Sequence, residues 1–380
     1  MLHIDEVPKS VMSTLFSPFT LRSLNLPNRI VVSPMCQYAA AHGRAGAWHL
    51  MHLGGLALSG AGLLVIEATA VEPDGRITPR CLGLWDDATE AALRPALEAV
   101  RAHSKIAVAI QLAHAGRKGS SRVPWEGGAQ IHPPEGWPTS APSSLPHTQG
   151  EMLPIALDDA GLERVRRAFV ESTRRAARLG IDAIEIHAAH GYLLHEFLSP
   201  IANARTDAYG GELQNRMRFP LQIFEAVREA FPAERPVGVR VSVTDWVTGG
   251  WDLAQTIAFA SELHKRGVDW VTASSGGVSP QQRIALAPAY QVPFATAIKE
   301  AVGINTIAVG LITDARQAEE IVSGGKADFV ALARGMLYDP RWGWHAAAQL
   351  GGTVNAPPQY WRAPPHQHKD LFGDIVHGAR

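Results

Sequence analysis

The chain has 380 residues, 46% hydrophobic and 19% charged, a balance that suits a folded globular protein and excludes a disordered one. Lys and Arg number 35 and Asp and Glu 36, so the net charge of −1 gives no argument for binding nucleic acid or an anionic membrane. The two cysteines, Cys36 and Cys81, exclude a disulfide framework and an iron–sulfur cluster, and they suit a reducing compartment.

The N-terminal residues 1–13 contain Asp5 and Glu6 and lack the apolar core of a signal peptide. No later stretch is long and apolar enough to span a bilayer, so we expect a cytoplasmic protein that does not enter a membrane. Residues 16–26 follow, and they are predicted to form a short hairpin that plugs the floor of the fold.

Eight short runs rich in β-branched residues recur along the chain. Apolar runs without alternation are typical of parallel strands that are buried on both faces. They lie at residues 29–33, 63–67, 106–111, 183–187, 237–241, 270–274, 306–309 and 329–332.

Amphipathic stretches between these runs predict helices. In the clearest of them, residues 161–179, apolar side chains recur at helical spacing. Asp158 or Asp159 can cap its first turn, and Gly180 can end it in the left-handed conformation. The other clear stretches are residues 221–230, 253–265, 292–302 and 315–323.

Strands that alternate with helices eight times predict an α/β fold, a (β/α)8 TIM barrel over residues 15–350 of a single domain covering 1–380. The alternative is an open doubly wound sheet, which we disfavour because no glycine-rich dinucleotide turn follows the first strand. Residues 120–154, after the third strand, hold seven prolines and two tryptophans, and we expect an active-site cap or a disordered insert there. Residues 357–380 are predicted to form an irregular tail.

Polar side chains follow the predicted strands, at the end of a barrel that carries the chemistry. Each one alone could be an ordinary strand-end residue, but together on one rim they indicate a site. Strands one to three lead into Ser33, Pro34, Met35, Cys36, Tyr38, Ala68, Gln111 and Lys118, and strands four to eight lead into His187, His190, Tyr192, Arg240, Gly310, Ala333 and Arg334.

Glycines and an arginine after the last two strands suit a phosphate, which barrels often hold there with backbone amides. Gly310, Arg334 and Gly335 are placed for this role, and Arg334 can bind a phosphate through two parallel hydrogen bonds. The alternative for Arg334 is a surface side chain beside a helix.

The pair His187 and His190 leaves three interpretations open. They could be core histidines bonded to backbone carbonyls, two ligands of a metal with Glu185 as a third, or donors to a carbonyl oxygen that gains negative charge. Lys118 is either a solvated loop charge or a substrate anchor. Cys36, taken alone, is most often a buried small hydrophobe.

Several stretches, in this order and spacing, match a known family. The chain resembles the Old Yellow Enzyme family of flavin-dependent ene-reductases, in particular its thermophilic-like bacterial subgroup. The resemblance extends from residue 15 to residue 360 and rests on LPNRI at 26–30, SPMC at 33–36, GRIT at 75–78, QLAHAGRK at 111–118, EIHAAHGY at 185–192, HEFLSP at 195–200 and RTDAYGG at 205–211.

The resemblance implies a barrel that binds FMN, with NADPH or NADH as the reductant and an α,β-unsaturated ketone or aldehyde as the substrate. The flavin would pass a hydride from N5 to the β-carbon of the alkene, and no metal is implied. FMN would be held by Ser33, Pro34, Met35, Cys36, Ala68, Gln111, Arg240, Gly310, Ala333 and Arg334.

The same resemblance implies roles for the residues around the substrate. His187 and His190 would hold the carbonyl oxygen, and Tyr192 would protonate the α-carbon. Tyr38 would add a hydrogen bond to the substrate, and Lys118 would border the pocket.

The resemblance also implies a homodimer or homotetramer in which Trp361 and Arg362 reach a neighbouring active site, and a Cys36 thiol that tunes the flavin potential. This chain carries Ala333 where the subgroup often has glycine. Two other functions stay open on the residues alone: a cofactor-free lyase or isomerase that acts on a phosphorylated substrate with His187 as base, and a barrel that serves as a binding scaffold.

Overall fold

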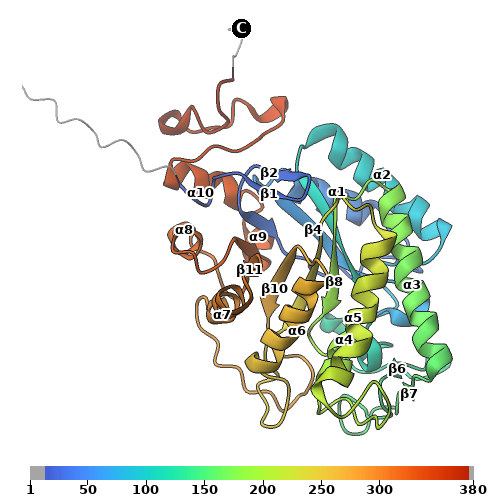
Figure 1. Cartoon of the computed structure of the whole chain (residues 1–380). Coiled ribbons are helices and arrows are strands. Elements are labelled where there is room, and N and C mark those ends of the chain that lie inside the picture. The colour runs from blue at the N-terminus through green and yellow to red at the C-terminus, as the bar shows by residue number, and fades with distance from the viewer. Residues whose placement is uncertain (1–12, 376–380) are drawn as a thin grey trace, which may run out of the picture.

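The computed structural model describes residues 13–375, and the eight predicted strands form one closed parallel barrel in it (Figure 1). The last strand pairs with the first, Val330 opposite Ile30, so the barrel prediction is confirmed and the open doubly wound sheet is wrong. The strands are β3 (Ile30–Val32), β4 (Leu63–Ala70), β5 (Ala107–Ala113), β8 (Ala183–Ala188), β9 (Val237–Ser242), β10 (Trp270–Ser274), β11 (Thr306–Ala308) and β12 (Phe329–Leu332).

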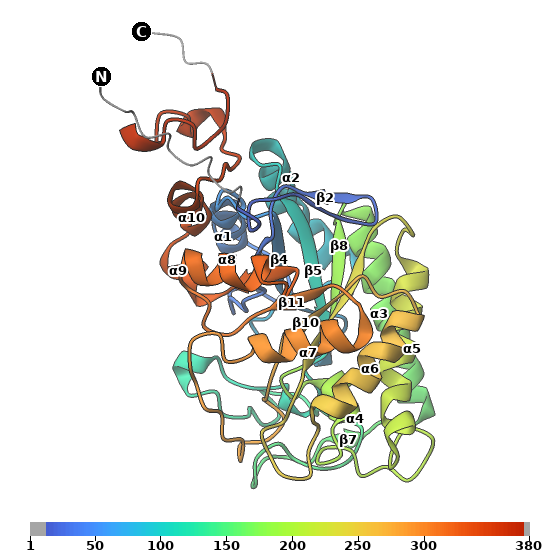
Figure 2. The same ribbon diagram turned by 60° about the vertical axis from the view of Figure 1, so that its left-hand side comes forward.

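Helices surround the barrel, as Figures 1 and 2 show. Three of the predicted helices have the predicted bounds, but α5 begins at Leu213 and runs through Pro220. That proline removes one helical hydrogen bond, and burial of Phe219 and Phe224 on the same helix offsets the loss. The helices are α1 (Ala47–Ala57), α2 (Asp87–His103), α3 (Asp159–Arg178), the short α4 (Leu193–Leu198), α5 (Leu213–Ala230), α6 (Leu253–Lys265), α7 (Val292–Val302), α8 (Ala315–Ser323), the short α9 (Arg334–Tyr338) and α10 (Trp342–Leu350).

The two ends of α3 show which of the alternative caps the chain uses. The Asp158 side chain accepts a hydrogen bond from the Gly161 backbone N–H at 2.8 Å, so Asp158 and not Asp159 is the N-cap. Gly180 follows the helix with a φ of +73°, the left-handed conformation that glycine adopts without steric cost.

The predicted N-terminal hairpin is confirmed and lies across the amino ends of the barrel strands. Its strands β1 (Phe19–Leu21) and β2 (Leu24–Leu26) pair antiparallel. Leu21 and Leu26 are buried in one apolar cluster with Trp270 and Phe329 of the barrel interior. The hairpin therefore seals the barrel floor with leucines and leaves the opposite rim for chemistry.

The 120–154 segment lies at that opposite rim. It contains a 3-10 turn at Pro124–Glu126 and a short strand β6 (Ser140–Ala141), which pairs with β7 (Ile155–Ala156). Figure 1 shows β6 and β7 close to α4, at the end of the barrel away from β1 and β2. Proline and glycine prevent longer elements in this segment, so its shape depends on contacts with the rim.

The C-terminal tail lies beside α10, at the hairpin end of the molecule (Figures 1 and 2). Trp361 packs into an apolar cluster with Trp344, Leu371 and Phe372, and Arg362 is exposed. Neither side chain therefore reaches the rim of its own barrel. Residues 1–12 and 376–380, which the sequence arguments about a signal peptide and a tail include, lie outside the described residues.

Within residues 13–375, every helix is either too short or too polar to cross a membrane.

Leu26→Ala should lower the free energy of unfolding by about 2–5 kcal/mol, because it opens a cavity between the hairpin and the barrel floor. Urea denaturation followed by circular dichroism measures the change. Leu153→Ala is the matched control, since that side chain is 65% exposed and its loss should change stability by less than about 0.5 kcal/mol. Equal effects of the two substitutions would show that the hairpin does not seal the floor.

Candidate active site

The register of the barrel brings polar side chains from different strands together at one rim. Gln111 on β5 lies opposite Glu185 on β8, and His187 lies opposite Arg240 on β9. Residues two apart on a strand share a face, so Glu185 and His187 lie one above the other on the same face of β8.

The Glu185 carboxylate orients Gln111. Its Oε1 accepts a hydrogen bond from the Gln111 amide at 2.8 Å, and its Oε2 accepts one from the Thr272 hydroxyl at 2.5 Å. With one N–H engaged, Gln111 keeps its carbonyl oxygen and its second N–H for a partner at the rim. Glu185 is thus committed to Gln111, and residues 13–375 contain no group of three or more His, Cys, Asp or Glu arranged to hold a metal.

Arg240 brings an unused donor into the same space. Its Nη1 donates to Ser33 Oγ at 3.1 Å, whereas its Nε is buried without a hydrogen-bond partner among the described residues. Burial lowers the pKa of Arg240, and the Glu185 carboxylate opposes that shift. A buried cation with a free N–H is a group that a carbonyl or an anionic ring edge satisfies.

His187 and His190 form a directional chain of hydrogen bonds. The Ala189 backbone N–H donates to Nδ1 of His187 at 3.2 Å, so the proton of a neutral His187 is on Nε2. That Nε2 is 3.4 Å from Nδ1 of His190, whose own Nε2 is 2.7 Å from the Ser274 hydroxyl. Burial lowers the pKa of both rings, and Arg240 adds to the shift, so both are neutral near pH 7. Each ring therefore carries an N–H at Nε2.

The turn after β8 is held tightly from both sides. His190 has a φ of +60°, its N–H donates to Ser242 Oγ at 2.9 Å, and its carbonyl accepts from Lys118 Nζ at 2.8 Å. Lys118 Nζ also lies 5.2 Å from the centroid of the Tyr192 ring, and burial lowers its pKa to about 8. The Tyr192 ring meets the His187 ring edge-on, with 4.9 Å between the ring centroids. Burial raises the pKa of Tyr192, so the Tyr192 hydroxyl keeps its proton near pH 7.

Cys36 and Tyr38 complete the rim after β3. Burial raises the pKa of the Cys36 thiol, and Cys81 and Glu67 add to the shift. Burial likewise raises the pKa of Tyr38, whose ring packs edge-on against Trp125 of the 120–154 segment at 5.7 Å. Both groups are therefore protonated near pH 7 and act as hydrogen-bond donors, not as nucleophiles.

The loops after β11 and β12 carry three residues predicted to bind FMN, Gly310, Ala333 and Arg334. Gly310 has a φ of +108°, and a Cβ there would lie 2.7 Å from Gln291 Nε2, so only glycine fits. Ala333 precedes α9, and Arg334 opens that helix with an exposed side chain. Backbone amides and a guanidinium in this arrangement suit a phosphate.

Comparison with known proteins decides the family. The sequence matches the profile of the NADH:flavin oxidoreductase / NADH oxidase family over residues 14–351. The chain belongs to this family, that of the Old Yellow Enzymes. It is 43% identical to an NADPH dehydrogenase of Geobacillus thermodenitrificans over 352 residues, which cover 92% of this chain and 98% of the relative. An NADPH dehydrogenase of Listeria monocytogenes is 42% identical over 357 residues, which cover 93% and 99% of the two chains.

Solved structures agree with the sequence relatives. Morphinone reductase superposes with a TM-score of 0.75 at 30% identity over 91% of this chain and 92% of its own. A structure of morphinone reductase in complex with tetrahydroNAD gives a TM-score of 0.74 at the same identity, over 91% of this chain and 93% of its own. This Old Yellow Enzyme is thus an FMN-dependent oxidoreductase with a nicotinamide reductant. The findings set aside the lyase and scaffold alternatives.

The rim residues of this Old Yellow Enzyme fit FMN chemically. Gln111 offers an oriented amide and Arg240 offers a buried, unused N–H, and both suit the polar edge of a flavin ring. Gly310 and Arg334 suit its phosphate. The assignment of each residue to a particular flavin atom stays a prediction.

A cavity of about 290 Å³ opens beside Tyr38 and Lys118 in this Old Yellow Enzyme. Arg122, Gln130 and His147 of the 120–154 segment form part of its wall. Burial lowers the pKa of His147 to about 4, and Lys118 adds to the shift, so this imidazole is neutral near pH 7. The segment therefore shapes the space next to the paired histidines.

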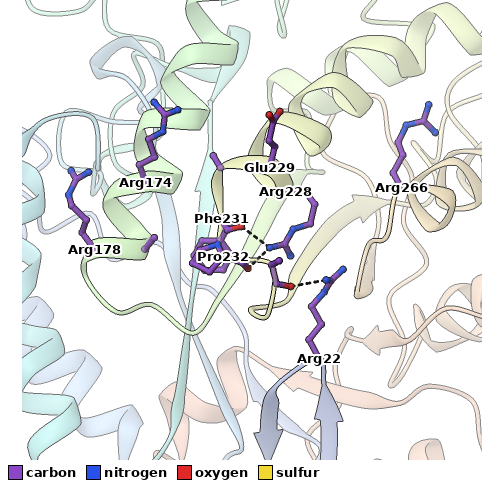
Figure 3. Close-up of a pocket in the computed structure, with 11 residues that line it drawn as sticks. Arg22, Arg174, Arg178, Arg228, Glu229, Phe231, Pro232 and Arg266 are labelled. Carbon is purple, nitrogen blue, oxygen red and sulfur yellow. Dashed lines mark hydrogen bonds between the residues drawn. The ribbon is translucent and has the colours of Figure 1, made fainter.

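A larger cavity, of about 860 Å³, lies near the barrel floor, between α3, α5 and the β1–β2 hairpin (Figure 3). Its arginines already have partners. Arg22 bonds to Asp269 at 2.6 Å, and Arg228 donates to the Phe231 carbonyl at 3.0 Å. Arg174, Arg178 and Arg266 pair with Glu171, Glu90 and Glu225.

The sequence analysis predicted no role for three buried carboxylates next to the site. Glu67 accepts a hydrogen bond from the Gln37 N–H at 3.0 Å, Glu196 accepts one from the Arg117 N–H at 2.9 Å, and Asp245 lies beside α4. The available signal was an acidic residue within or beside an apolar run, because a buried carboxylate needs partners.

Glu196→Gln should stabilise the protein more at pH 8 than at pH 5. Burial raises the pKa of Glu196 to about 8, while Arg117 and Lys118 oppose the shift. The folded chain then keeps a proton that the unfolded chain releases near its ordinary pKa, so stability falls as pH rises between these two values. Glutamine removes that loss and keeps the acceptor for the Arg117 N–H.

The melting temperatures of variant and wild type at pH 5 and pH 8 test this prediction. Glu163→Gln on the exposed face of α3 is the control, since its pKa is lowered and its effect should not vary over this range. A difference between Glu196→Gln and wild type that is the same at both pH values would contradict the prediction.

Proposed function

We propose that this Old Yellow Enzyme reduces the C=C bond of α,β-unsaturated ketones and aldehydes, with NADPH or NADH as the reductant. The observation that carries the proposal is the pair of neutral imidazoles, His187 and His190, beside a protonated Tyr192. Their Nε2–H groups are directed at His190 Nδ1 and Ser274 Oγ, and a substrate oxygen would accept both in place of these partners. Two donors on one carbonyl oxygen withdraw electrons from the conjugated alkene and stabilise the negative charge that develops on that oxygen.

When bound, FMN supplies the two-electron step, the transfer of a hydride from the nicotinamide to the β-carbon. The chain holds and tunes it. The Arg240 guanidinium balances negative charge at the ring edge, and the protonated Cys36 thiol influences its potential. We assign Ser33, Pro34, Met35, Cys36, Ala68, Gln111 and Arg240 to the ring and Gly310, Ala333 and Arg334 to the phosphate.

The remaining step needs a proton on the α-carbon. Tyr192 keeps its hydroxyl proton because burial raises its pKa, and its ring is in contact with His187. A donor next to the carbonyl-binding histidines is in the right region to protonate the adjacent carbon. Tyr38 adds a hydrogen bond to the substrate. Tyr38 and Lys118 line the cavity in which we place the end of the substrate away from the carbonyl group.

We also propose a homodimer or homotetramer in which Trp361 and Arg362 reach the neighbouring active site. The position of the tail supports this, because it lies far from the rim of its own barrel (Figure 2). A two-fold arrangement would make the exchange of tails reciprocal. The free Cys36 and Cys81 support a reducing compartment, the cytoplasm.

His187→Ala should lower the rate of reoxidation by cyclohex-2-enone about 10²–10³-fold, the typical effect of losing one oxyanion donor. Reduction by NADPH should be much less affected, because a hydride leaving the nicotinamide needs no carbonyl polarisation. Anaerobic stopped-flow absorbance of the two half-reactions measures both rates. A wild-type enzyme that NADPH reduces but cyclohex-2-enone does not reoxidise would overturn the proposed function. A loss confined to the NADPH reaction would overturn the role of His187.

Arg362→Ala should raise the KM for cyclohex-2-enone severalfold without changing the oligomeric state, because a cation near the partner's substrate is lost. Arg316→Ala, on the exposed face of α8, is the matched control and should leave the KM unchanged. Steady-state kinetics and sedimentation velocity give both readouts. A strictly monomeric enzyme, or an unchanged KM in Arg362→Ala, would rule out the reciprocal tail.

A further inference from the structure

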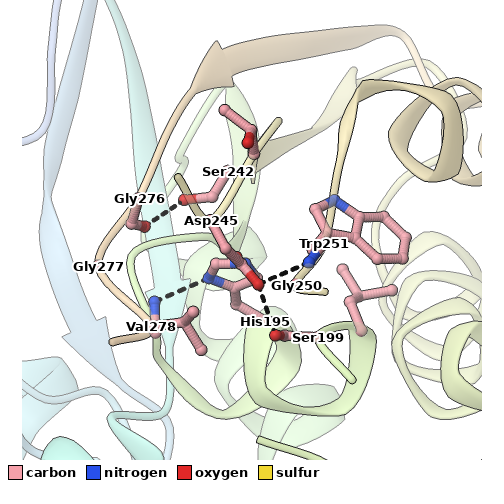
Figure 4. Close-up of polar contacts among 12 residues, drawn as sticks. His195, Ser199, Ser242, Asp245, Gly250, Trp251, Gly276, Gly277 and Val278 are labelled. Carbon is pink, nitrogen blue, oxygen red and sulfur yellow. Dashed lines mark hydrogen bonds and ion pairs between the residues drawn. The ribbon is translucent and has the colours of Figure 1, made fainter. Parts of the chain in front are cut away.

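A buried His–Asp pair, His195 and Asp245, lies next to the turn that carries His190 and Tyr192. Figure 4 shows the two side chains in contact. Nδ1 of His195, on α4, accepts a hydrogen bond from the Gly191 backbone N–H at 2.9 Å. Its Nε2 lies 2.9 Å from Oδ1 of Asp245, in the loop after β9. Both side chains are 0% exposed, so water cannot replace either contact.

The state of the His195 ring follows from these two contacts. A backbone N–H only donates, so Nδ1 carries no proton and the single proton is on Nε2, facing the carboxylate. Asp245 Oδ2 accepts from the Ser199 hydroxyl at 2.6 Å and from the Trp251 N–H at 2.7 Å. Burial would raise the pKa of Asp245, but His195 and these donors lower it, so it stays ionised. The Gly191 N–H thereby fixes the tautomer of His195, and the nearby carboxylate stabilises it.

Position 191 accepts only glycine. Its φ is +74°, and a Cβ there would overlap the Gly277 carbonyl oxygen, so the turn packs backbone to backbone against the loop after β10. Ser242 holds the His190 N–H and donates in turn to the Gly276 carbonyl at 2.7 Å. Two backbone N–H groups of this turn donate to imidazoles: that of Ala189 to His187, which we place at the substrate, and that of Gly191 to His195, which lies behind the turn.

We propose that His195 and Asp245 are positioning residues that fix the His190–Tyr192 turn through the Gly191 N–H, and so set where the two substrate-facing side chains lie. Neither touches the substrate. The inference rests on the proposed function. A displaced turn would impair the binding of a carbonyl group and the donation of a proton, but it would not impair the reaction of the flavin with an oxidant that has no carbonyl group.

Two substitutions of His195 separate its two contacts. In His195→Asn, the amide oxygen replaces Nδ1 and keeps an acceptor for Gly191, while the contact with Asp245 is lost. In His195→Gln, the amide nitrogen replaces Nε2 and keeps the contact with Asp245, while the acceptor for Gly191 is lost. His345→Gln is the control, since His345 also meets an aspartate, Asp339, at 2.6 Å but is exposed on α10.

The reduced, FMN-loaded variants are mixed with cyclohex-2-enone in the absence of oxygen. In a separate experiment they are mixed with dioxygen, whose reduction needs no hydrogen-bond donor to a carbonyl. We expect His195→Gln to lose about tenfold or more in the enone rate, since a shift of about 1 Å costs up to 10²-fold. The dioxygen rate should stay within about twofold of wild type, and His195→Asn should lose less of the enone rate than His195→Gln. Equal losses in both reactions, a wild-type enone rate in His195→Gln, or a larger loss in His195→Asn would overturn the proposal.

Hydrogen exchange of the peptide that covers residues 189–193 measures how firmly His195 and Asp245 hold the Gly191 N–H, the contact called the clamp below, and it needs no reaction. It should be faster in His195→Gln than in His195→Asn, and unchanged in His345→Gln; equal exchange in the two His195 variants would also overturn the proposal. If wild type fails to react with cyclohex-2-enone, the proposed function is wrong, and this exchange still decides the clamp.

Asp245→Asn tests the same clamp should His195→Gln fail to bind FMN. The asparagine oxygen goes to the Oδ2 position, which has two donors, and its NH2 then faces His195 Nε2. The ring proton must move to Nδ1, where it opposes the Gly191 N–H, so the same selective loss of the enone rate is expected. A wild-type enone rate and wild-type exchange in Asp245→Asn would overturn the proposal.

Discussion

The pairing of β12 with β3 closes the barrel, and the rest of the structure depends on that closure. A closed parallel barrel has no free strand edge, and all its strands end on the same side. Ser33, Gln111, His187 and Arg240 lie far apart along the chain, and they become neighbours only because the sheet returns on itself. The β1–β2 hairpin fills the opposite end with leucines, so one rim is open and the other is sealed.

Burial is the second constraint, and it gives the rim its chemistry. Polar groups taken from water must find partners, and here the partners also set the state of each group. Glu185 turns the Gln111 amide, and the Ala189 N–H sets the proton on His187. Burial beside Arg240 keeps the imidazoles neutral, so positive charge at the rim resides on Arg240 and on Lys118 at its border. A rim with neutral donors and a buried cation favours a ligand that gains negative charge during reaction.

Two segments outside the strands and helices of the barrel, residues 120–154 and the C-terminal tail, lie at opposite ends of the molecule. The 120–154 segment lies over the rim, contacts Tyr38 through Trp125 and lines the cavity beside Lys118, so it shapes the space next to the site. The C-terminal tail is anchored at the other end by Trp361, Trp344 and Phe372. A change in the segment therefore alters the surroundings of a substrate within one chain, whereas the tail lies at the far end of the barrel and contacts the site only in the oligomer that we propose.

Local patterns determined the elements of this protein. Apolar runs specify strands buried on both faces, and eight of them alternating with helices specify a barrel, because side-chain periodicity is a property of the chain itself. The strand-end motifs likewise marked the rim, and the start of α5 was misjudged because the burial that compensates for Pro220 is a long-range contact.

What the tertiary structure alone decided is how the marked residues are connected. That Glu185 serves Gln111, that Asp245 lies against His195, and that Glu196 lies buried beside Arg117 all depend on contacts between residues tens of positions apart. Proton positions and pKa values follow from those contacts and from desolvation, which arise only when the strands have been brought together. Periodicity could therefore name the elements and the rim, whereas the orientation and charge state of each side chain come from the packing of the closed barrel.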